Sequence, residues 1–233
     1  RMNATKNPDD GSIWVFFGTG KYLSAEDVDN TSVQTWYGLR AQTKGSGKSS
    51  SDGTTGRSDL VERSIVAEQA VGDVTARATS EGSRSELDVN DKVGWYMDLI
   101  SPEHGEEGER ILYVSQLVGS YLYVNTTIPK AGDPCDTLPP GASMIVDPFS
   151  GANPGQPFMD VSGDGDFDTI GDLPVSGVVS RIGASGASTF AKDPEGNILG
   201  INPDLGGGIR EMPSLDFGST SAEQLNWHEL VGH

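Results

Sequence analysis

The sequence has 233 residues and a formal net charge of −18, with 34 acidic and 16 basic side chains. This excess of negative charge argues against nucleic acid or an anionic membrane as a partner, and it favours divalent cations. No apolar run is long enough to span a bilayer, so no transmembrane segment is expected. The chain does not open on a signal-peptide pattern, and residues 1–8 read as the middle of a connection. We therefore expect a piece of a longer protein.

Short apolar or alternating runs, separated by glycine and proline, predict many short strands. The sequence contains 31 glycines and 13 prolines, which suits frequent turns. The strands expected in the first part of the chain cover residues 13–17, 33–39, 93–99, 110–118, 121–128 and 142–146. Shorter ones are expected at 175–181, 189–192, 198–201 and 224–230.

Three segments have other expected structures. Ser24 is placed to cap a single helical turn over residues 24–28. Residues 43–57 contain no apolar side chain and predict an exposed, flexible loop. Residues 60–71 favour a helix by propensity, but they can also pair with the strand that starts at Val74 in a hairpin about Gly72-Asp73.

Little of the pattern is helical, so the predicted fold class is all-β, built of short antiparallel strands joined by long loops. Similar strand ends recur at residues 36–39, 95–99 and 144–147, a spacing of about 50 to 60 residues. Propeller blades of four strands give such a spacing. Two interpretations stay open: an incomplete β-propeller that needs a further segment, or strands arranged in sandwich-like sheets.

The candidate metal site is the acidic loop at residues 160–172, where carboxylates alternate with small or apolar residues. Such crowding of negative charge is costly unless a hard cation neutralises it. Calcium is the natural candidate, because it takes about six to eight oxygen ligands in a flexible geometry. The predicted ligands are Asp160, Ser162, Asp164, Asp166, Asp168 and Asp172.

The loop departs from the EF-hand pattern, so we expect a calcium loop between strands. Gly165 occupies the sixth position, where such loops turn sharply, but Gly171 stands at position 12 in place of a bidentate Glu. A second assignment of the ligand positions, which starts at Asp164, has no glycine at its sixth position, so we rank it lower. The alternative is a solvated acidic turn without an ion, since Asp and Gly are ordinary turn residues.

No other motif supports chemistry. Residues 45–49 resemble the end of a phosphate-binding loop, but Gln42 stands where the first glycine is required. His104, His228 and His233 are scattered, which argues against zinc. Cys135 is the only cysteine and lies between two acidic neighbours that disfavour its thiolate, so we expect no nucleophile there. Catalysis is not expected.

An ordered set of motifs resembles the C-terminal region of PilY-type, type IV pilus tip-associated adhesins and biogenesis factors. The resemblance spans roughly residues 7–230, and the order of the motifs is more specific than any one of them. The motifs are FFGTGKYL (16–23), VQTWYGL (33–39), GWYMDL (94–99), GER (108–110), TIP (127–129), DPC (133–135), the acidic loop and NWHEL (226–230).

The resemblance implies that residues 1–233 are the C-terminal part of a modified β-propeller whose N-terminal part lies outside this chain. It implies a bacterial protein exported through the periplasm to the pilus tip or outer surface. The implied role is non-enzymatic: pilus assembly, extension and retraction, and calcium-dependent adhesion. The implied partners are the type IV pilin or minor pilins, a host or abiotic surface ligand, and the rest of the same protein.

Two alternatives from other classes stay in view. One is a calcium-dependent propeller enzyme, such as a quinoprotein-type dehydrogenase or a hydrolase, which needs convergent polar groups that the sequence does not offer. The other is a purely structural secreted β-domain. Unchanged piliation after loss of the protein would favour the structural alternative over the pilus function.

Overall fold

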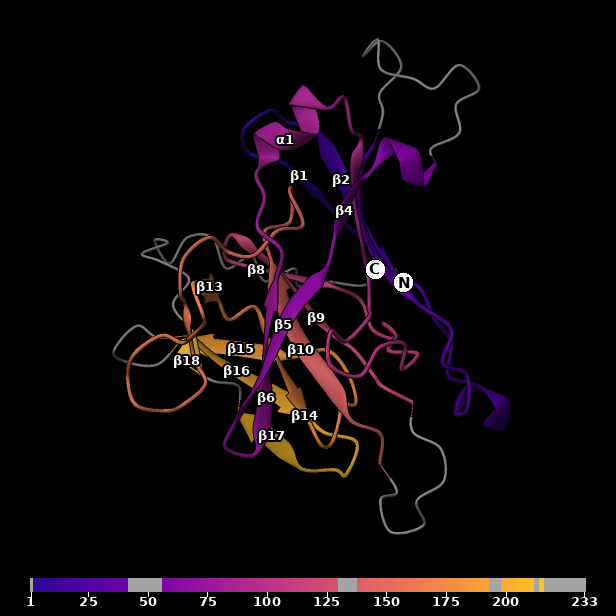
Figure 1. Cartoon of the computed structure of the whole chain (residues 1–233), viewed down its shortest axis with the longest axis vertical. Helices are drawn as coiled ribbons and strands as arrows, with labels where there is room; N and C mark the ends of the chain where they lie inside the picture. The colour runs from indigo at the N-terminus through magenta and orange to yellow at the C-terminus, as the bar shows by residue number, and fades with distance from the viewer. Residues whose placement is uncertain (1, 42–55, 130–137, 193–197, 212–213, 216–233) are drawn as a thin grey trace, which may run out of the picture.

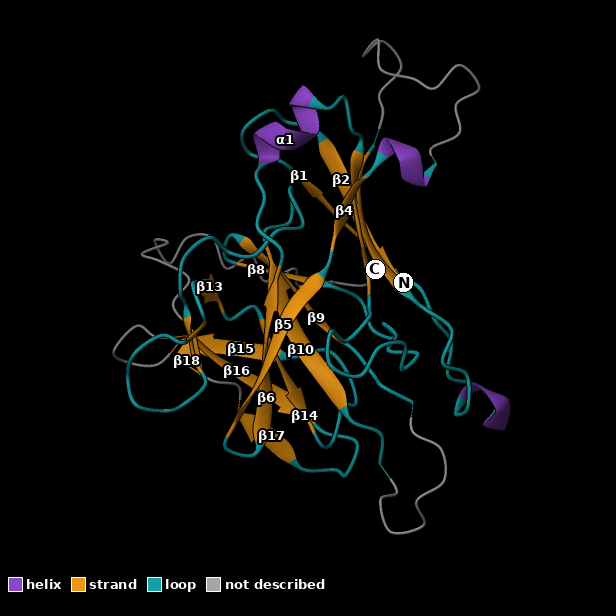
Figure 2. Cartoon of the chain, viewed as in Figure 1, coloured by secondary structure: helices purple, strands orange, loops and turns teal. Residues whose placement is uncertain are grey.

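The computed structural model describes residues 2–41, 56–129, 138–192, 198–211 and 214–215 (Figure 1). Strands dominate the described part of the chain, which confirms a mainly β fold (Figure 2). Its helices are α1 (Arg84–Val89) and two 3-10 turns, η1 (Ala25–Asp27) and η2 (Arg57–Asp59). Within the described ranges, no helix has the length and apolar character that crossing a membrane requires.

The first sheet contains mostly N-terminal strands in the order β1-β2-β3-β7-β4. Neighbours are antiparallel, except that β4 runs parallel to β7. The strands are β1 (Asn3–Lys6), β2 (Ile13–Gly18), β3 (Thr35–Arg40), β7 (Gly94–Asp98) and β4 (Val61–Arg63).

The central sheet is antiparallel throughout, in the order β5-β6-β14-β10-β9-β8. Its strands come from separate parts of the chain, because β14 returns to lie between β6 and β10. They are β5 (Ile65–Val71), β6 (Val74–Thr79), β14 (Gly177–Ser180), β10 (Gly141–Val146), β9 (Tyr121–Asn125) and β8 (Gln116–Val118).

The third sheet has the order β11-β18-β16-β15, with β17 also paired to β16. Its strands are β11 (Met159–Asp160), β18 (Ser214–Leu215), β16 (Ile198–Pro203), β15 (Thr189–Lys192) and β17 (Ile209–Glu211). A separate hairpin joins β12 (Thr169–Ile170) to β13 (Leu173–Pro174).

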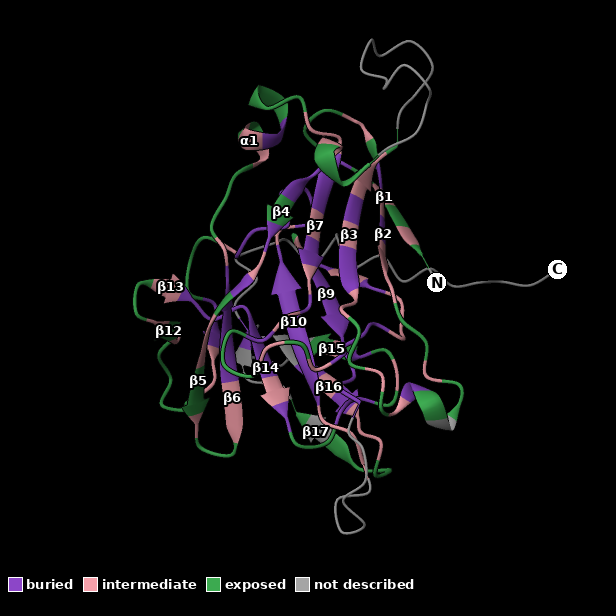
Figure 3. Cartoon of the chain, turned by 45° about the vertical axis from the view of Figure 1, so that its right-hand side comes forward, coloured by how far each residue is buried: buried purple, intermediate pink, exposed green. Residues whose placement is uncertain are grey.

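Strands β9 and β10 of the central sheet are buried on both faces (Figure 3), whereas β5 at its edge is mostly exposed or half-buried. Successive side chains of a strand point to opposite faces. Leu122, Val124 and Met144 therefore join one core with the tryptophans of the first sheet. Tyr123 and Ile145, between them in sequence, join a second core. That second core includes Phe158, Met159, Val178 and Leu215, with Phe190 packed against it.

A buried polar cluster closes the contact between the central and third sheets. The hydroxyl of Tyr123 donates to Asn125 Oδ1, and Ser188 Oγ donates to the Tyr123 hydroxyl oxygen at 2.7 Å. Asn202 Nδ2 donates to Ser143 Oγ at 3.0 Å. Burial raises the pKa of the Tyr123 phenol. Because each of these groups has a partner, the cluster holds polar side chains inside the core without unpaired donors.

Most predicted strands are confirmed, and the ambiguous segment at 60–71 resolves in favour of the hairpin, with Val71 opposite Val74. The strand predicted over 110–118 is shorter: Arg110 makes only an isolated bridge to Thr127, and β8 begins at Gln116. Helix α1 was not predicted; its N-terminus is capped by Ser83 Oγ, which accepts from Glu86 N at 3.3 Å. That these sheets form part of an incomplete β-propeller stays a prediction.

Of the loop predicted over 43–57, residues 43–55 lie outside the described part of the chain. Arg57 is exposed; it opens η2 and forms an ion pair with Asp98 at 2.6 Å. This ion pair holds the start of η2 against β7, and a flexible loop over 43–57 stays a prediction.

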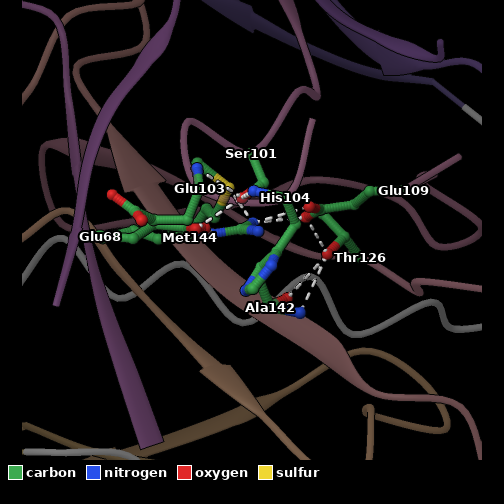
Figure 4. A network of polar contacts seen from close by, with 9 residues as sticks. Glu68, Ser101, Glu103, His104, Glu109, Thr126, Ala142 and Met144 are labelled. Carbon is green, nitrogen blue, oxygen red and sulfur yellow. Dashed lines mark hydrogen bonds and ion pairs between the residues drawn. The ribbon is translucent and has the colours of Figure 1, made fainter. Parts of the chain in front are cut away.

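A buried ion network holds the central sheet to the segment between β7 and β8 (Figure 4). Arg77 Nε donates to Glu68 Oε1 at 2.6 Å, and its Nη1 donates to Glu109 Oε2 at 2.7 Å. All three side chains are at most 2% exposed. The two carboxylates outweigh the desolvation of the guanidinium and raise the pKa of Arg77.

The register of the central sheet explains how Arg77 reaches its partners. Glu68, Arg77, Gly177 and Met144 lie opposite one another across four adjacent strands. Arg77 Nη1 lies 3.9 Å from Met144 Sδ, so its guanidinium passes over Gly177. A Cβ at Gly177 would lie 2.8 Å from the Ser143 carbonyl oxygen and 3.0 Å from Met144 Cγ. Gly177 therefore permits the close packing of β14 against β10 beside the network.

Hydroxyl groups donate further hydrogen bonds to both carboxylates of the network. Ser101 Oγ donates to Glu68 Oε2 at 2.6 Å, and Thr126 Oγ1 donates to Glu109 Oε1 at 2.5 Å. The backbone N–H of His104 in turn donates to Ser101 Oγ at 2.9 Å. The network therefore fixes the loop after β7 as well as the sheet.

We expect Arg77→Met to destabilise the protein by about 3–5 kcal/mol, because it leaves two buried carboxylates without their cation. The control is Arg57→Met, which breaks an ion pair whose arginine side chain is 49% exposed. An exposed pair of this kind contributes about 0–1 kcal/mol. Urea unfolding of both variants measures the difference. Equal losses in the two variants would contradict the structural weight given to the buried network.

Candidate functional site

The acidic loop at 160–172 leaves the third sheet at Asp160 and ends at the β12–β13 hairpin. Its base is fixed to the core by Met159, which is fully buried. Asp168 N donates to the Met159 carbonyl at 2.9 Å, and Val175 N donates to the Asp168 carbonyl at 3.3 Å. The residues between these anchors are mostly exposed, including Phe167 at 40%.

Two of the predicted ligands close the loop through backbone N–H groups. Asp160 accepts from Gly163 N at 2.7 Å and from Gly165 N at 3.0 Å, using one carboxylate oxygen for each. Asp168 Oδ2 accepts from Val161 N at 2.6 Å and from Ser162 N at 2.9 Å. These carboxylates therefore stabilise the turn directly.

The sharp turn predicted at Gly165 is present. Its φ is +96°, a conformation that side chains with a Cβ rarely adopt. Asp164 Oδ1 accepts from Asp166 N at 2.9 Å, a further local turn contact. Asp172, next to Gly171, lies in the exposed turn of the β12–β13 hairpin. Asp and Gly are residues that favour local turns of this kind.

The structure does not gather the six predicted ligands around one point. Ser162 Oγ lies 3.5 Å from Asp160 Oδ1. Among the described residues, no group of three or more His, Cys, Asp or Glu side chains is placed to hold a metal ion. In this conformation the carboxylates of Asp160, Asp164 and Asp168 accept backbone N–H groups of the loop. A bound calcium stays a prediction.

The other candidate residues do not form a site in the described ranges. His104 is exposed and takes part in the buried ion network only through its backbone N–H. The remaining candidates lie outside those ranges: residues 45–49, Cys135, His228 and His233. Two motifs of the resemblance, DPC at 133–135 and NWHEL at 226–230, lie outside them as well.

The motifs that lie within the described ranges form buried contacts. Trp36 and Trp95 are fully buried and meet edge to face, with ring centroids 5.5 Å apart. Arg110 donates to the carbonyls of Lys21 at 2.6 Å, Asp27 at 3.2 Å and Asn30, and desolvation lowers the pKa of its guanidinium. The motif residues in the described ranges therefore lie in the buried interior of this chain.

The η1 turn that Arg110 holds has its own buried carboxylate. Asp27 is 2% exposed and accepts from the backbone N–H groups of Leu23 at 2.9 Å and Ser24 at 3.0 Å. The Leu23 and Ser24 amides, with Lys21, lower the pKa of Asp27 to about 2. The FFGTGKYL segment and GER motif thus meet in one place.

Sequence reasoning missed the buried ion network, although a local signal for part of it existed. A two-residue turn at Gly72-Asp73 places Glu68 opposite Arg77, and the structure has this register. The contact of Arg77 with Glu109 has no such signal, because those residues are far apart in sequence and meet only when the sheet forms.

No protein-family model matches this sequence. Over 226 residues, or 95% of the chain, it is 35% identical to a protein named type IV pilus biogenesis factor PilY1 homolog, from Xylella fastidiosa strain Temecula1. A second protein of the same name and organism is 28% identical over 150 residues. The chain spans only 17% and 9% of the lengths of these two relatives.

The fold is also similar to a solved structure, the crystal structure of the Pseudomonas aeruginosa PilY1 C-terminal domain. The TM-score is 0.68 at 21% sequence identity, and the match covers 93% of this chain and 44% of that one. Sequence identity along nearly the whole chain and the shared fold agree on one family. The chain is a homologue of the PilY1-type type IV pilus biogenesis factors and matches part of their C-terminal domain.

Proposed function

We propose that this chain is a non-enzymatic part of a type IV pilus biogenesis factor, acting at the pilus tip or outer bacterial surface. The observation that carries the proposal is the 35% identity to a protein named for pilus biogenesis. The proposed roles are pilus assembly, support of extension and retraction, and adhesion to a surface. The proposed partners are the pilin or minor pilins, a host or abiotic ligand, and the rest of the same protein.

The physical character of the chain suits a scaffold. Its central sheet packs on both faces, and a buried ion network fixes a loop to that sheet. Such packing gives a rigid body that can transmit force and present loops at fixed positions. The formal charge of −18 favours partners with basic surfaces or bound cations.

Calcium binding by the acidic loop is the regulatory part of the proposal. Asp160 and Asp168 already fix both ends of the loop through backbone N–H groups. In this conformation the proposed ligands do not meet around one point, so the loop must rearrange when an ion binds. The proposed ligands are the oxygens of Asp160, Ser162, Asp164, Asp166, Asp168 and Asp172.

We expect calcium to raise the melting temperature of this chain, since an ion that binds only the folded state stabilises it. At about 100 times Kd the gain is about 2.7 kcal/mol. For a domain of this size that gain corresponds to about 5–10 °C. The double variant Asp164→Asn, Asp166→Asn should lose both this shift and the heat of binding in calorimetry.

The matched control is Glu103→Gln, Glu106→Gln, which removes two exposed carboxylates outside the acidic loop. It should keep the full response to calcium. No heat and no shift in the unmodified chain would contradict calcium binding, and the pilus proposal would then stand on homology alone. An equal loss in both variants would show a general charge effect.

The test of the pilus role is deletion of the region that encodes this chain from the gene of its parent protein. We expect surface pilin to fall several-fold, and twitching motility to be lost, although the truncated protein is still exported. Complementation with the intact gene should restore both. Normal piliation and motility in the deletion strain would contradict the proposal and favour a structural secreted β-domain.

A further inference from the structure

Strand β5 forms an open edge of the central sheet (Figure 3). It pairs with β6 on one side, and the order of the sheet ends there. With 7 residues it is the longest strand in the described part of the chain. The edge strands of the first sheet are shorter, with 4 residues in β1 and 3 in β4. Edge strands are usually short, because their unpaired backbone groups can pair with another chain.

The β5–β6 hairpin determines which backbone groups face the open side. Val71 and Val74 flank its two-residue turn. Residues in this position form a hydrogen-bonded pair, and hydrogen-bonded and non-hydrogen-bonded pairs then alternate along the strands. Glu68 and Ala70 therefore lie in non-hydrogen-bonded pairs, and their N–H and C=O groups point away from β6. Within the described ranges, these groups have no backbone partner.

Strand β5 has few of the features that protect an edge. Its sequence, IVAEQAV, contains no proline, glycine or lysine. A bulge between Ile65 and Ala67 bends one end of the strand. Its one charged side chain, Glu68, is buried in the ion network with Arg77. The regular part of the strand, from Ala67 to Val71, is therefore open to a further strand.

The loop after β7 brings negative charge to this edge. Ser101 Oγ donates to Glu68 Oε2 at 2.6 Å, so the loop is held against β5 (Figure 4). Glu103 and Glu106 of the loop are exposed. A strand added to β5 would therefore lie close to these carboxylates, and basic side chains on that strand would be attracted to them.

Glu107 of the same loop is half-buried and adds to this negative charge. Burial raises the pKa of Glu107, and the carboxylates of Glu109 and Glu68 strengthen the effect. His104 and Arg77 offset only part of it, so the net shift is upward. A cation brought to this edge would favour the ionised form of Glu107.

We propose that β5 binds an extended segment of a partner protein as a further strand of the central sheet, and that this segment carries basic side chains. The backbone groups of Glu68 and Ala70 supply the hydrogen bonds, and the carboxylates of the neighbouring loop select for positive charge. The formal net charge of −18 favours a partner of the same kind. The inference goes beyond the proposed function and does not depend on the pilus role.

Binding of a short peptide to the intact chain tests the proposal. The peptide has about eight residues, because a strand of that length spans the open part of β5. It alternates valine and lysine, and its affinity is measured by fluorescence anisotropy. We expect saturable binding that weakens with salt, and slower hydrogen exchange at the amides of Glu68 and Ala70. A matched peptide that alternates valine and glutamate should not bind.

Ala70→Pro separates strand addition from general attraction between charges. It removes an outward N–H group and leaves the net charge unchanged, and proline is tolerated where an edge N–H faces solvent. We expect the melting temperature to stay close to that of the unmodified chain, and the affinity for the valine–lysine peptide to fall about tenfold. The variant Glu103→Gln, Glu106→Gln should also weaken binding several-fold.

Three results would overturn the proposal. One is equal affinity of Ala70→Pro and the unmodified chain, since charge alone would then explain the binding. Another is binding without slower exchange at Glu68 and Ala70, a criterion that holds even if the proline variant is destabilised. The third is protection of these amides without peptide, either in the parent protein or in a dimer of this chain detected by sedimentation, because the edge would then already be filled.

Discussion

The architecture depends on one constraint, the burial of the inner strands β9 and β10 of the central sheet on both faces. Strands β9 and β10 carry apolar side chains on each side, and each side belongs to a different core. Burying apolar surface contributes about 25 cal/mol per Å². The first and third sheets are therefore needed to cover the two faces of the central sheet. Each of them contributes aromatic or large aliphatic residues to one side of the same central layer.

This constraint determines where polar groups are tolerated. An unpaired buried charge is very costly, so Arg77 must meet both Glu68 and Glu109. The Tyr123 cluster meets the same requirement with neutral groups between the central and third sheets. Both networks join segments far apart in sequence. They favour one arrangement of the sheets, because any other would leave their donors or acceptors unsatisfied.

Local sequence patterns predicted many of the strands and turns, but they did not predict how distant strands pair into sheets. The run at 13–17, the turn at Gly72-Asp73 and the turn at Gly119-Ser120 predicted strands and hairpins that the structure confirms. No local pattern placed β14 between β6 and β10, since that pairing joins residues about 100 apart. The acidic loop was located correctly, but its conformation was not predicted: Asp160 and Asp168 accept backbone N–H groups, a contact that composition does not encode.

The central claim is that a doubly covered central sheet holds this domain together. Native-state hydrogen exchange of the intact chain tests it most directly. The amides of β9 and β10 should exchange only through global unfolding, whereas those of the edge strand β1 exchange through local opening. The free energy of opening of the β10 amides should then fall with urea concentration with the same m-value as global unfolding. Fast exchange of β10 by local opening, at a rate like that of β1, would contradict this account.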